Sequence, residues 1–468
     1  MRVTPKDSHP PLYSHQDTAV KWCLGRLNSY LSMDMGSGKS RCIVSLRDWL
    51  DAPLTLVITT KRAVAHVWPG EFVKWAEQDV EVIPMRTGTV ASRIKKANLK
   101  LASRGDVPAV VVCNWEMLRS KTFEAWLKQW PWRLIACDEA HKAKSPTGTT
   151  SKALTRVMRA SSDAFKVMLS GTPMPHSPLD IWAQMRALDV EVFGPRYHAF
   201  QSRIAVMGGF PNPRTGRGTV PVAWQNMDWM QEQLRRVMYQ PEIELDLPAT
   251  RHIRVAVDLN AKTRALYDTV EADIVAMIGA GDINPQNGLV KLLRLQQIAS
   301  GIAVSETMDD WGEVTRTTTT VGQDKADAVL EIIEGTDQPV VVFCVFRAEL
   351  DAIAGAAAAA GTPCSELSGR RDELAEWLAG DSRVLAVQIA AGSEALDFTR
   401  AHHCVFMSTG FNMGQYEQAL KRCHRPGQDQ PVTYYHVCAT DTVDTRVYET
   451  LLKRGDLVRA ALEGLTQQ

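Results

Sequence analysis

Short apolar runs that alternate with helical patterns constrain the fold of this chain more than any other feature. Four β-rich runs in the first half each end in polar or small residues, and they are Leu54–Ile58, Val110–Cys113, Leu134–Cys137 and Val167–Leu169. Strands that alternate with helices predict a mostly parallel sheet with both faces covered. Ligands bind such sheets at the carboxyl ends of the strands, so the polar residues there are candidates for a site.

The alternation returns in the second half, after Lys325. Its β-rich runs are Val340–Cys344, Val384–Ile389, Cys404–Met407 and Val432–Val437. The alanine run Ala356–Ala360 predicts a packed helix that ends at Gly361, because alanine is the best helix former and glycine commonly ends a helix. We therefore expect a second α/β domain in tandem with the first.

Between about residues 192 and 320 the alternation lapses. Helical periods occur there at Met227–Met238, Leu259–Ile278 and Leu289–Ile298. The Gly/Pro-rich segment from Gly208 to Gly218 is typical of a solvated loop. These patterns predict a first α/β domain at residues 1–190, helical protrusions and a linker at 191–320, and a second α/β domain at 321–468.

A glycine-rich turn at residues 33–40, with the sequence M-D-M-G-S-G-K-S, lies just before a helical pattern. Its glycines would let the backbone close around phosphate oxygens, while Lys39 would reach the β and γ phosphates and Ser40 would bind Mg²⁺. Met33 replaces the first glycine of the usual pattern, so a solvated turn with an exposed lysine is the alternative. The predicted nucleotide-binding residues of this turn are Gly36, Ser37, Gly38, Lys39 and Ser40.

Two acidic residues follow the run Leu134–Cys137. Asp138 at the tip of a buried strand can hold Mg²⁺, and Glu139 can act as the base that polarises an attacking water. His141 could instead hydrogen-bond a neighbouring strand end. The alternative for the carboxylates is a pair of surface acids.

Gln16 lies just ahead of a helical pattern and a short chain distance before the glycine-rich turn. Its amide can both donate and accept, as an adenine edge requires. A surface glutamine is the alternative that the residue alone favours.

Together these motifs resemble the N-terminal motor-domain motifs of the superfamily-two helicases. The resemblance is carried by Gln16, Asp34–Ser40, Thr60-Lys61, Asp138–His141 and Ser170–Pro173. Residues 169–188, L-S-G-T-P-M-P-H-S-P-L-D-I-W-A-Q-M-R-A-L, are similar to the Swi/Snf group of DNA translocases. Over about residues 10–455, the resemblance implies two RecA-like domains with a nucleotide in the interdomain cleft, and ATP hydrolysis stimulated by double-stranded DNA.

The run R-C-H-R-P-G-Q at residues 422–428 nearly matches motif VI of the family. Arg422 and Arg425 would share a helix face and supply positive charge to the transferring phosphate, whereas an exposed basic helix end is the alternative. Glu394 and Gln418 are nucleotide-binding candidates by the same resemblance. Ser393, Ala395 and Asp397 depart from motif V, where Gly, Gly and Asn are usual.

The resemblance also implies contacts with the phosphate backbone of DNA, which position the protein without reading bases. The net charge of zero requires these contacts to come from a local surface. For each lysine or arginine a solvated position is equally open. The candidates are Thr60, Lys61, Asn114, Ser170, Thr172, Arg294, Arg347 and Gly392.

Composition excludes several other classes of protein. No apolar run is long enough to span a membrane, and the N-terminus lacks a signal-peptide core. Nine singly scattered cysteines argue against a zinc site and for reduced thiols. The thirteen tryptophans, Trp68 among them, favour core packing over base stacking.

We therefore expect a cytoplasmic, monomeric translocase of a bacterium or a phage-infected host, acting on double-stranded and possibly branched DNA. A strand-separating DNA or RNA helicase of the same superfamily is one alternative. A slow, nucleotide-switched DNA-binding subunit of a larger complex is the other.

Overall fold

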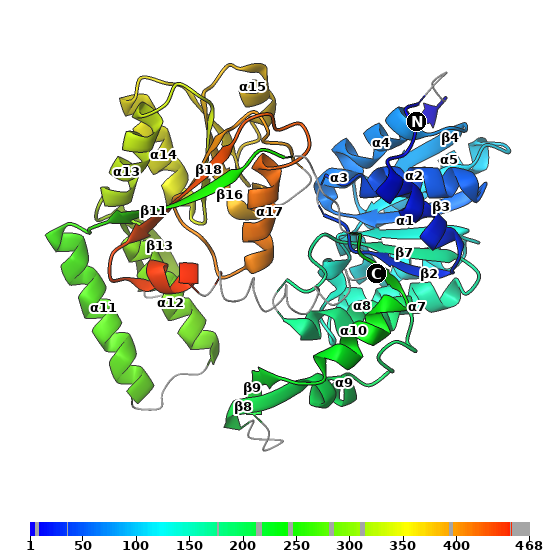
Figure 1. Cartoon of the computed structure of the whole chain (residues 1–468), viewed down its shortest axis with the longest axis horizontal. Helices are drawn as coiled ribbons and strands as arrows, with labels where there is room; N and C mark the ends of the chain where they lie inside the picture. Colours follow the sequence, from blue (N-terminus) through cyan, green and yellow to red (C-terminus); the bar gives the residue numbers. More distant parts are fainter. Residues whose placement is uncertain are drawn as a thin grey trace. The chain divides into compact units, whose positions relative to one another are not determined.

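The computed structural model describes residues 1–4, 9–34, 36–175, 177–211, 218–241, 247–279, 285–308, 314–392, 396–449 and 451. Contacts divide the chain into two compact units, Met1–Glu244 and Leu245–Gly455. Each unit is built on a mostly parallel sheet covered by helices, which confirms the predicted fold class (Figure 1). The contacts divide the chain at residue 244, and the predicted three-part division at residues 190 and 320 stays a prediction.

The first unit contains an eight-stranded sheet of order β1-β4-β5-β3-β6-β7-β2-β10. Only β1 runs antiparallel to its neighbour. All four predicted runs are confirmed as strands β3, β5, β6 and β7. The bounds are β1 (Arg2–Val3), β2 (Asn28–Leu31), β3 (Leu54–Thr59), β4 (Val80–Pro84), β5 (Ala109–Asn114), β6 (Leu134–Asp138), β7 (Phe165–Leu169) and β10 (Met238–Tyr239).

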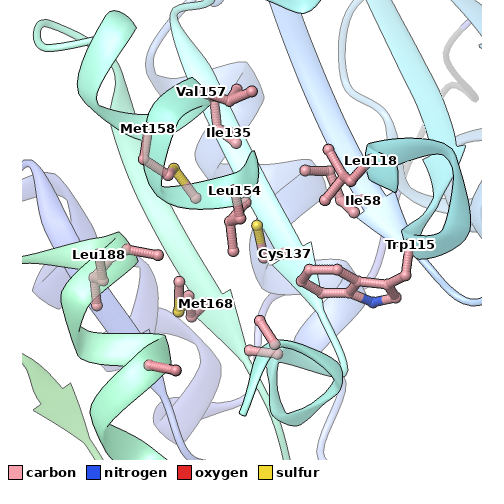
Figure 2. Close-up of a cluster of buried hydrophobic side chains, with 14 of the residues drawn as sticks. Ile58, Trp115, Leu118, Ile135, Cys137, Leu154, Val157, Met158, Met168 and Leu188 are labelled. Carbon is pink, nitrogen blue, oxygen red and sulfur yellow. The ribbon is translucent and has the colours of Figure 1, made fainter. Parts of the chain in front are cut away.

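Two groups of helices cover this sheet (Figure 1). One group comprises α1 (Ser14–Leu24), α2 (Lys39–Trp49), α3 (Lys61–His66) and α4 (Trp68–Trp75). The other comprises α5 (Val90–Ser103), the 3-10 helix η1 (Trp115–Arg119), α6 (Lys121–Leu127), α7 (Thr149–Ala160) and α8 (Ile181–Leu188). Figure 2 shows the core beneath the second group, where Ile135 and Met168 of the strands meet Leu154 and Met158 of α7.

The second unit contains a six-stranded, wholly parallel sheet of order β11-β18-β17-β14-β16-β15. The four predicted runs form β14, β16, β17 and β18, and the alanine run lies in α14, after which Gly361 has φ +64°. Helices α13 and α14 pack on one face, and α12, α15 and α17 on the other. The bounds are β11 (Thr250–Val257), α13 (Asp324–Glu334), β14 (Val340–Cys344), α14 (Arg347–Ala359), β15 (Cys364–Leu367), α15 (Leu374–Ala379), β16 (Val384–Gln388), α16 (Ile389–Gly392), β17 (His403–Phe406), α17 (Met413–Cys423) and β18 (Val432–Ala439).

The middle of the chain contains the three predicted helices and also two antiparallel hairpins. The predicted loop at Gly208–Gly218 is wrong at its ends, because residues 208–211 and 218 lie in the strands β8 and β9. β-Branched Val220 and Val222 alternate with smaller residues, a pattern that favours a strand. The helices are α9 (Tyr197–Ile204), α10 (Met227–Arg235), α11 (Ala261–Gly279) and α12 (Pro285–Ala299), and the hairpins are β8 (Ala205–Pro211) with β9 (Gly218–Trp224) and β12 (Ile302–Met308) with β13 (Val314–Thr320).

Within the described part of the chain, no helix is both long enough and apolar enough to cross a membrane.

Candidate functional site

The glycine-rich turn connects β2 to α2 at the carboxyl edge of the first sheet. Gly36 and Gly38 both have φ +82°, a conformation that glycine adopts without strain, and Gly38 is the N-cap of α2. The first turn of a helix has N–H groups without intrahelical acceptors, which suits an anion. Lys39 Nζ donates to the carbonyl oxygens of Met33 at 2.8 Å and Asp34 at 2.9 Å. The turn therefore has the amides and the cation of a phosphate site.

Gln16 is buried and braces this turn. Its Nε2 donates to the Ser37 carbonyl at 3.0 Å, and its Oε1 accepts from the Tyr13 N–H at 3.2 Å. A Cβ on residue 38 would lie 2.1 Å from Gln16 Nε2 and would displace this amide, and the φ of +82° also favours glycine there. Both ends of the amide thus have partners inside the protein, and the predicted adenine contact stays a prediction.

Asp138 ends β6, where the neighbouring strand β3 and the helix α4 bring donors to its carboxylate. Thr59 Oγ1 donates to Asp138 Oδ2 at 2.7 Å, and Trp68 Nε1 donates to the same oxygen at 3.1 Å. Burial and the adjacent Glu139 carboxylate raise the pKa of Asp138, while these two donors and Lys39 act in the opposite direction.

Glu139 combines a strained backbone with an unsatisfied oxygen. Its φ of +52° and ψ of +51° are left-handed, a conformation that costs free energy in a non-glycine residue and is common at functional sites. Its Oε2 is buried and has no hydrogen-bond partner among the described residues, although His141 Nδ1 lies 3.3 Å away. His141 Nδ1 also lies 3.0 Å from Ser170 Oγ, after the neighbouring strand β7. A buried carboxylate oxygen without a hydrogen bond suits a water or an ion.

The oxygen groups at this edge fit Mg²⁺. No described residue hydrogen-bonds Asp138 Oδ1, and Ser40 lies in the first turn of α2. The described residues contain no group of three or more His, Cys, Asp or Glu that could hold a metal by itself. Mg²⁺ is usually held by one or two carboxylates together with substrate phosphates and waters, so this donor set is sufficient.

The other predicted residues of the first unit lie along the same edge. Thr60, the N-cap of α3, and Thr172 are buried, and neither hydroxyl has a hydrogen-bond partner among the described residues. Ser170 Oγ accepts from the Thr172 N–H at 3.1 Å, and Lys61 is exposed. Since β5, β3, β6, β7 and β2 are consecutive in the sheet, the fold brings these residues to one edge with the turn.

Asn114, at the end of β5, is held by two neighbours. Its Oδ1 accepts from Arg93 at 3.2 Å, and its Nδ2 donates to Glu116. The amide therefore has protein partners on both sides.

In the second unit the two arginines of R-C-H-R-P-G-Q share one acceptor. Arg422 and Arg425 donate to the Leu396 carbonyl at 3.3 and 3.1 Å. Arg425 Nε also lies 3.9 Å from Asp397 Oδ2. Gln418 and Arg422 are buried on α17, which ends at Cys423 with an extended His424 after it. Arg425 therefore lies beyond the helix, and the prediction that the two arginines share a helix face is wrong. Glu394, predicted to bind nucleotide, lies outside the described residues, as do Ser393 and Ala395.

The predicted DNA contacts of the second unit fall into two places. Arg347 begins α14 after β14, and Gly392 ends α16 after β16, so both follow adjacent parallel strands. Arg347 is exposed. Arg294 lies on α12 and donates to the Val304 carbonyl of β12 at 3.3 Å.

Two tryptophans that donate hydrogen bonds to Asp138 were not predicted as site residues from the sequence. Trp68 is fully buried, as core packing predicts, but its indole N–H also donates a hydrogen bond to the Asp138 carboxylate. Trp115 Nε1 donates to the Asp138 carbonyl at 2.9 Å. A buried indole N–H usually finds a hydrogen-bond partner, which is the signal that could have pointed to both residues.

Comparisons with known proteins agree with this geometry. Residues 15–302 match the family model described as the SNF2-related domain, and residues 324–427 match the Helicase conserved C-terminal domain. The phage protein p41 of Acyrthosiphon pisum secondary endosymbiont phage 1 is 26% identical over 93% of this chain and 94% of its own length.

Two larger relatives are similar over most of this chain. One is the SWI/SNF-related matrix-associated actin-dependent regulator of chromatin subfamily A member 1 of Mus musculus, 21% identical over 94% of this chain and 42% of its own length. The other is the human DNA annealing helicase and endonuclease ZRANB3, 23% identical over 92% and 38%. The chain thus spans about two fifths of these relatives. Because the SNF2-related model covers more than half of the chain, the protein belongs to the SNF2-related family of helicase-like ATPases.

Proposed function

We propose that this protein is an ATP-dependent double-stranded DNA translocase that hydrolyses ATP to ADP and phosphate and remodels protein–DNA complexes or branched DNA. The observation that carries the proposal is the edge of the first sheet. A glycine-rich turn with Lys39 at a helix N-terminus lies along this edge. Asp138 and Glu139, whose Oε2 has no hydrogen-bond partner among the described residues, follow a strand that ends at the same edge.

The proposed roles follow from the positions of the side chains. The amides after Gly38 and the Lys39 ammonium bind the phosphates, for which Lys39 exchanges its present carbonyl acceptors. Ser40 and Asp138 hold magnesium, which when bound offsets the charge of the phosphate oxygens. Glu139 takes a proton from the water that attacks the γ phosphorus, and ADP leaves with the bridging oxygen.

The motif at residues 422–428 is proposed to supply positive charge to the transferring phosphate. Arg422 is buried, and Arg425 is three quarters buried. Both guanidinium groups already donate to one carbonyl oxygen and are largely buried. Exchanging that carbonyl for a phosphate oxygen therefore adds no further free-energy cost for burying the two positive charges.

DNA is proposed to contact both units through its phosphate backbone. The support comes from relatives that their names place on chromatin or DNA, and from the unsatisfied hydroxyls of Thr60 and Thr172 at the same edge as the ATP site. Binding should weaken with salt, with log affinity falling by about 0.9 per log salt for each phosphate engaged. The phage relative supports a phage or bacterial setting for this activity.

The test is steady-state ATP hydrolysis without nucleic acid, and with single-stranded DNA, duplex DNA, a fork or RNA, at one moderate salt concentration. Strong stimulation by duplex DNA is expected. Equal rates throughout would contradict the translocase and favour the nucleotide switch. A strand-displacement assay on a tailed duplex is expected to show no unwinding; efficient unwinding would instead establish a helicase.

A further inference from the structure

Two fully buried side chains hold one oxygen of the Asp138 carboxylate. Thr59 Oγ1 lies 2.7 Å and Trp68 Nε1 lies 3.1 Å from Oδ2, and neither donor residue is accessible to solvent. Two donors on one oxygen fix the rotation of the carboxylate about its own axis. Because no described residue hydrogen-bonds Oδ1, this rotation decides where the second oxygen points.

The backbone of Asp138 is held as well. Trp115 Nε1 donates to the Asp138 carbonyl at 2.9 Å, and Trp115 is 3% exposed. The pairing of β3 with β6 sets Ile58 opposite Cys137, so Thr59 and Asp138 follow side by side. Three donors from three segments thus converge on one residue.

Two of the donors adjoin a proposed DNA contact along the chain, and the third is linked to one by helix packing. Thr59 immediately precedes Thr60 and Lys61, and Trp115 immediately follows Asn114. Trp68 begins α4, which packs on α3, the helix that starts at Lys61. A bound phosphate that displaces residues 60–61 or 114 therefore also moves a donor of Asp138. That donor is either the next residue in the chain or part of the helix packed on α3.

We propose that Thr59 and Trp68 are positioning residues, which orient the Asp138 carboxylate toward magnesium and transmit DNA contact at residues 60–61 to that carboxylate. The inference rests on the proposed function and deepens it, since it names how duplex DNA stimulates hydrolysis. Hydrogen-bond partners of a metal-binding carboxylate typically contribute a factor of about 10 to 100 in metal affinity or activity. Packing alone requires neither the hydroxyl nor the indole N–H.

The variants Thr59→Val and Trp68→Phe remove the two donors and keep most of the shape. The chain offers matched controls. Thr55 lies on the same face of β3, is equally buried, and has no hydrogen-bond partner for its hydroxyl among the described residues. Trp132 donates its indole N–H to the Leu127 carbonyl at 2.8 Å, within the core of the same unit. Thr55→Val and Trp132→Phe therefore report the general cost of the same chemical changes.

The first readout is binding, which needs no turnover. Binding of a fluorescent ATP analogue to the full chain is titrated with Mg²⁺ in the absence of DNA. In Thr59→Val and Trp68→Phe the Mg²⁺ concentration that gives half of the maximal change in binding of the analogue should rise about tenfold or more. The controls and Thr59→Ser should need the same Mg²⁺ concentration as the unmodified chain. An unchanged Mg²⁺ dependence in Thr59→Val, with its melting temperature preserved, would overturn the inference. Thr59→Val is nearly isosteric, so it decides the matter even where Trp68→Phe does not fold.

The second readout is the ratio of hydrolysis rates with and without duplex DNA. Thr59→Val should lower this ratio, and Thr59→Ser should restore it. If the unmodified chain shows no stimulation by DNA, the proposed function fails while the Mg²⁺ titration still tests the orientation of Asp138. If the unmodified chain is stimulated and Thr59→Val responds equally, only the transmission through Thr59 is refuted.

Discussion

Each unit of this protein places a lysine at the start of a helix that packs on a parallel sheet, but one lysine is buried in an ion pair and the other is half-buried. Lys39 begins α2 and Lys325 is the second residue of α13. Both ammonium groups reach a backbone carbonyl, Met33 for Lys39 at 2.8 Å and Met407 for Lys325 at 3.1 Å. Lys325 is 2% exposed and forms an ion pair with buried Asp444. Lys39 is half-buried and follows Gly38.

The carboxylates nearby differ less than the two lysines do. In the second unit, Glu349 Oε2 accepts from the N–H groups of Val345 and Phe346 and from Ser408 Oγ. In the first unit, Glu139 Oε2 is buried and has no hydrogen-bond partner among the described residues, and the same holds for Glu349 Oε1 in the second unit. A lysine at the start of a helix therefore indicates a binding site only where a glycine-rich turn keeps the cation accessible, because a buried carboxylate oxygen without a partner occurs in both units.

The largest expected effect tests the unsatisfied carboxylate. Glu139→Gln keeps the size of the side chain but removes the base, so hydrolysis should fall by a factor of roughly a thousand to ten thousand, with ATP binding retained. Single-turnover hydrolysis and equilibrium binding of a fluorescent ATP analogue measure the two properties. Equal turnover in this variant would remove Glu139 as the base.

The next effect tests whether the second unit contributes to catalysis although its Lys325 is buried and paired. Arg425→Ala should slow hydrolysis by roughly a thousandfold without weakening ATP binding, because an arginine finger acts on the charge of the transition state. Arg383 offers a control in the same unit, since its guanidinium serves the carbonyls of Ile333 and Thr336. Unaffected turnover in Arg425→Ala would show that the positive charge comes from elsewhere.

The same substitution at the two lysines sharpens the comparison directly. Lys325→Met leaves Asp444 buried without its partner and should cost about 3–5 kcal/mol of unfolding free energy. Lys39→Met should cost less than about 1 kcal/mol, because the side chain is half-buried, but it should abolish tight ATP binding. Urea unfolding and nucleotide titration measure both. Similar losses of stability at the two positions would refute the contrast.

The smallest effect concerns pH and the core of the second unit. Burial lowers the pKa of His436 to about 3, and His252 Nδ1 lies 3.3 Å from its Nε2. The folded state keeps His436 neutral while the unfolded state protonates it below about pH 6.5, so stability falls as pH falls. Between pH 7 and pH 5 this group should remove about 2 kcal/mol.

His436→Gln should flatten that part of the stability profile, as measured by urea unfolding at both pH values. A profile equally steep in the variant would assign the pH dependence to other groups.

The strands that carry the site could be predicted from the sequence, since the apolar runs before Thr59, Asp138 and Ser170 are confirmed as β3, β6 and β7. Parallel topology follows from that alternation, so the strand ends and the turn at residues 33–40 could be placed on one edge from the sequence pattern alone. The motifs also identified the family. Hydrophobic periodicity did not predict the strands β8 and β9, because glycine and proline residues dominate the local sequence pattern.

The pairing of the polar groups could not be predicted from the sequence. Lys39 and Lys325 both follow a strand and begin a helix, and nothing in their local sequence shows that one meets Asp444 across more than a hundred residues. The donors Thr59 and Trp68 meet Asp138 from 79 and 70 residues away. Hydrogen bonds of this kind depend on which strands are neighbours and which way each side chain faces, and both are settled when the sheet and its helices pack together.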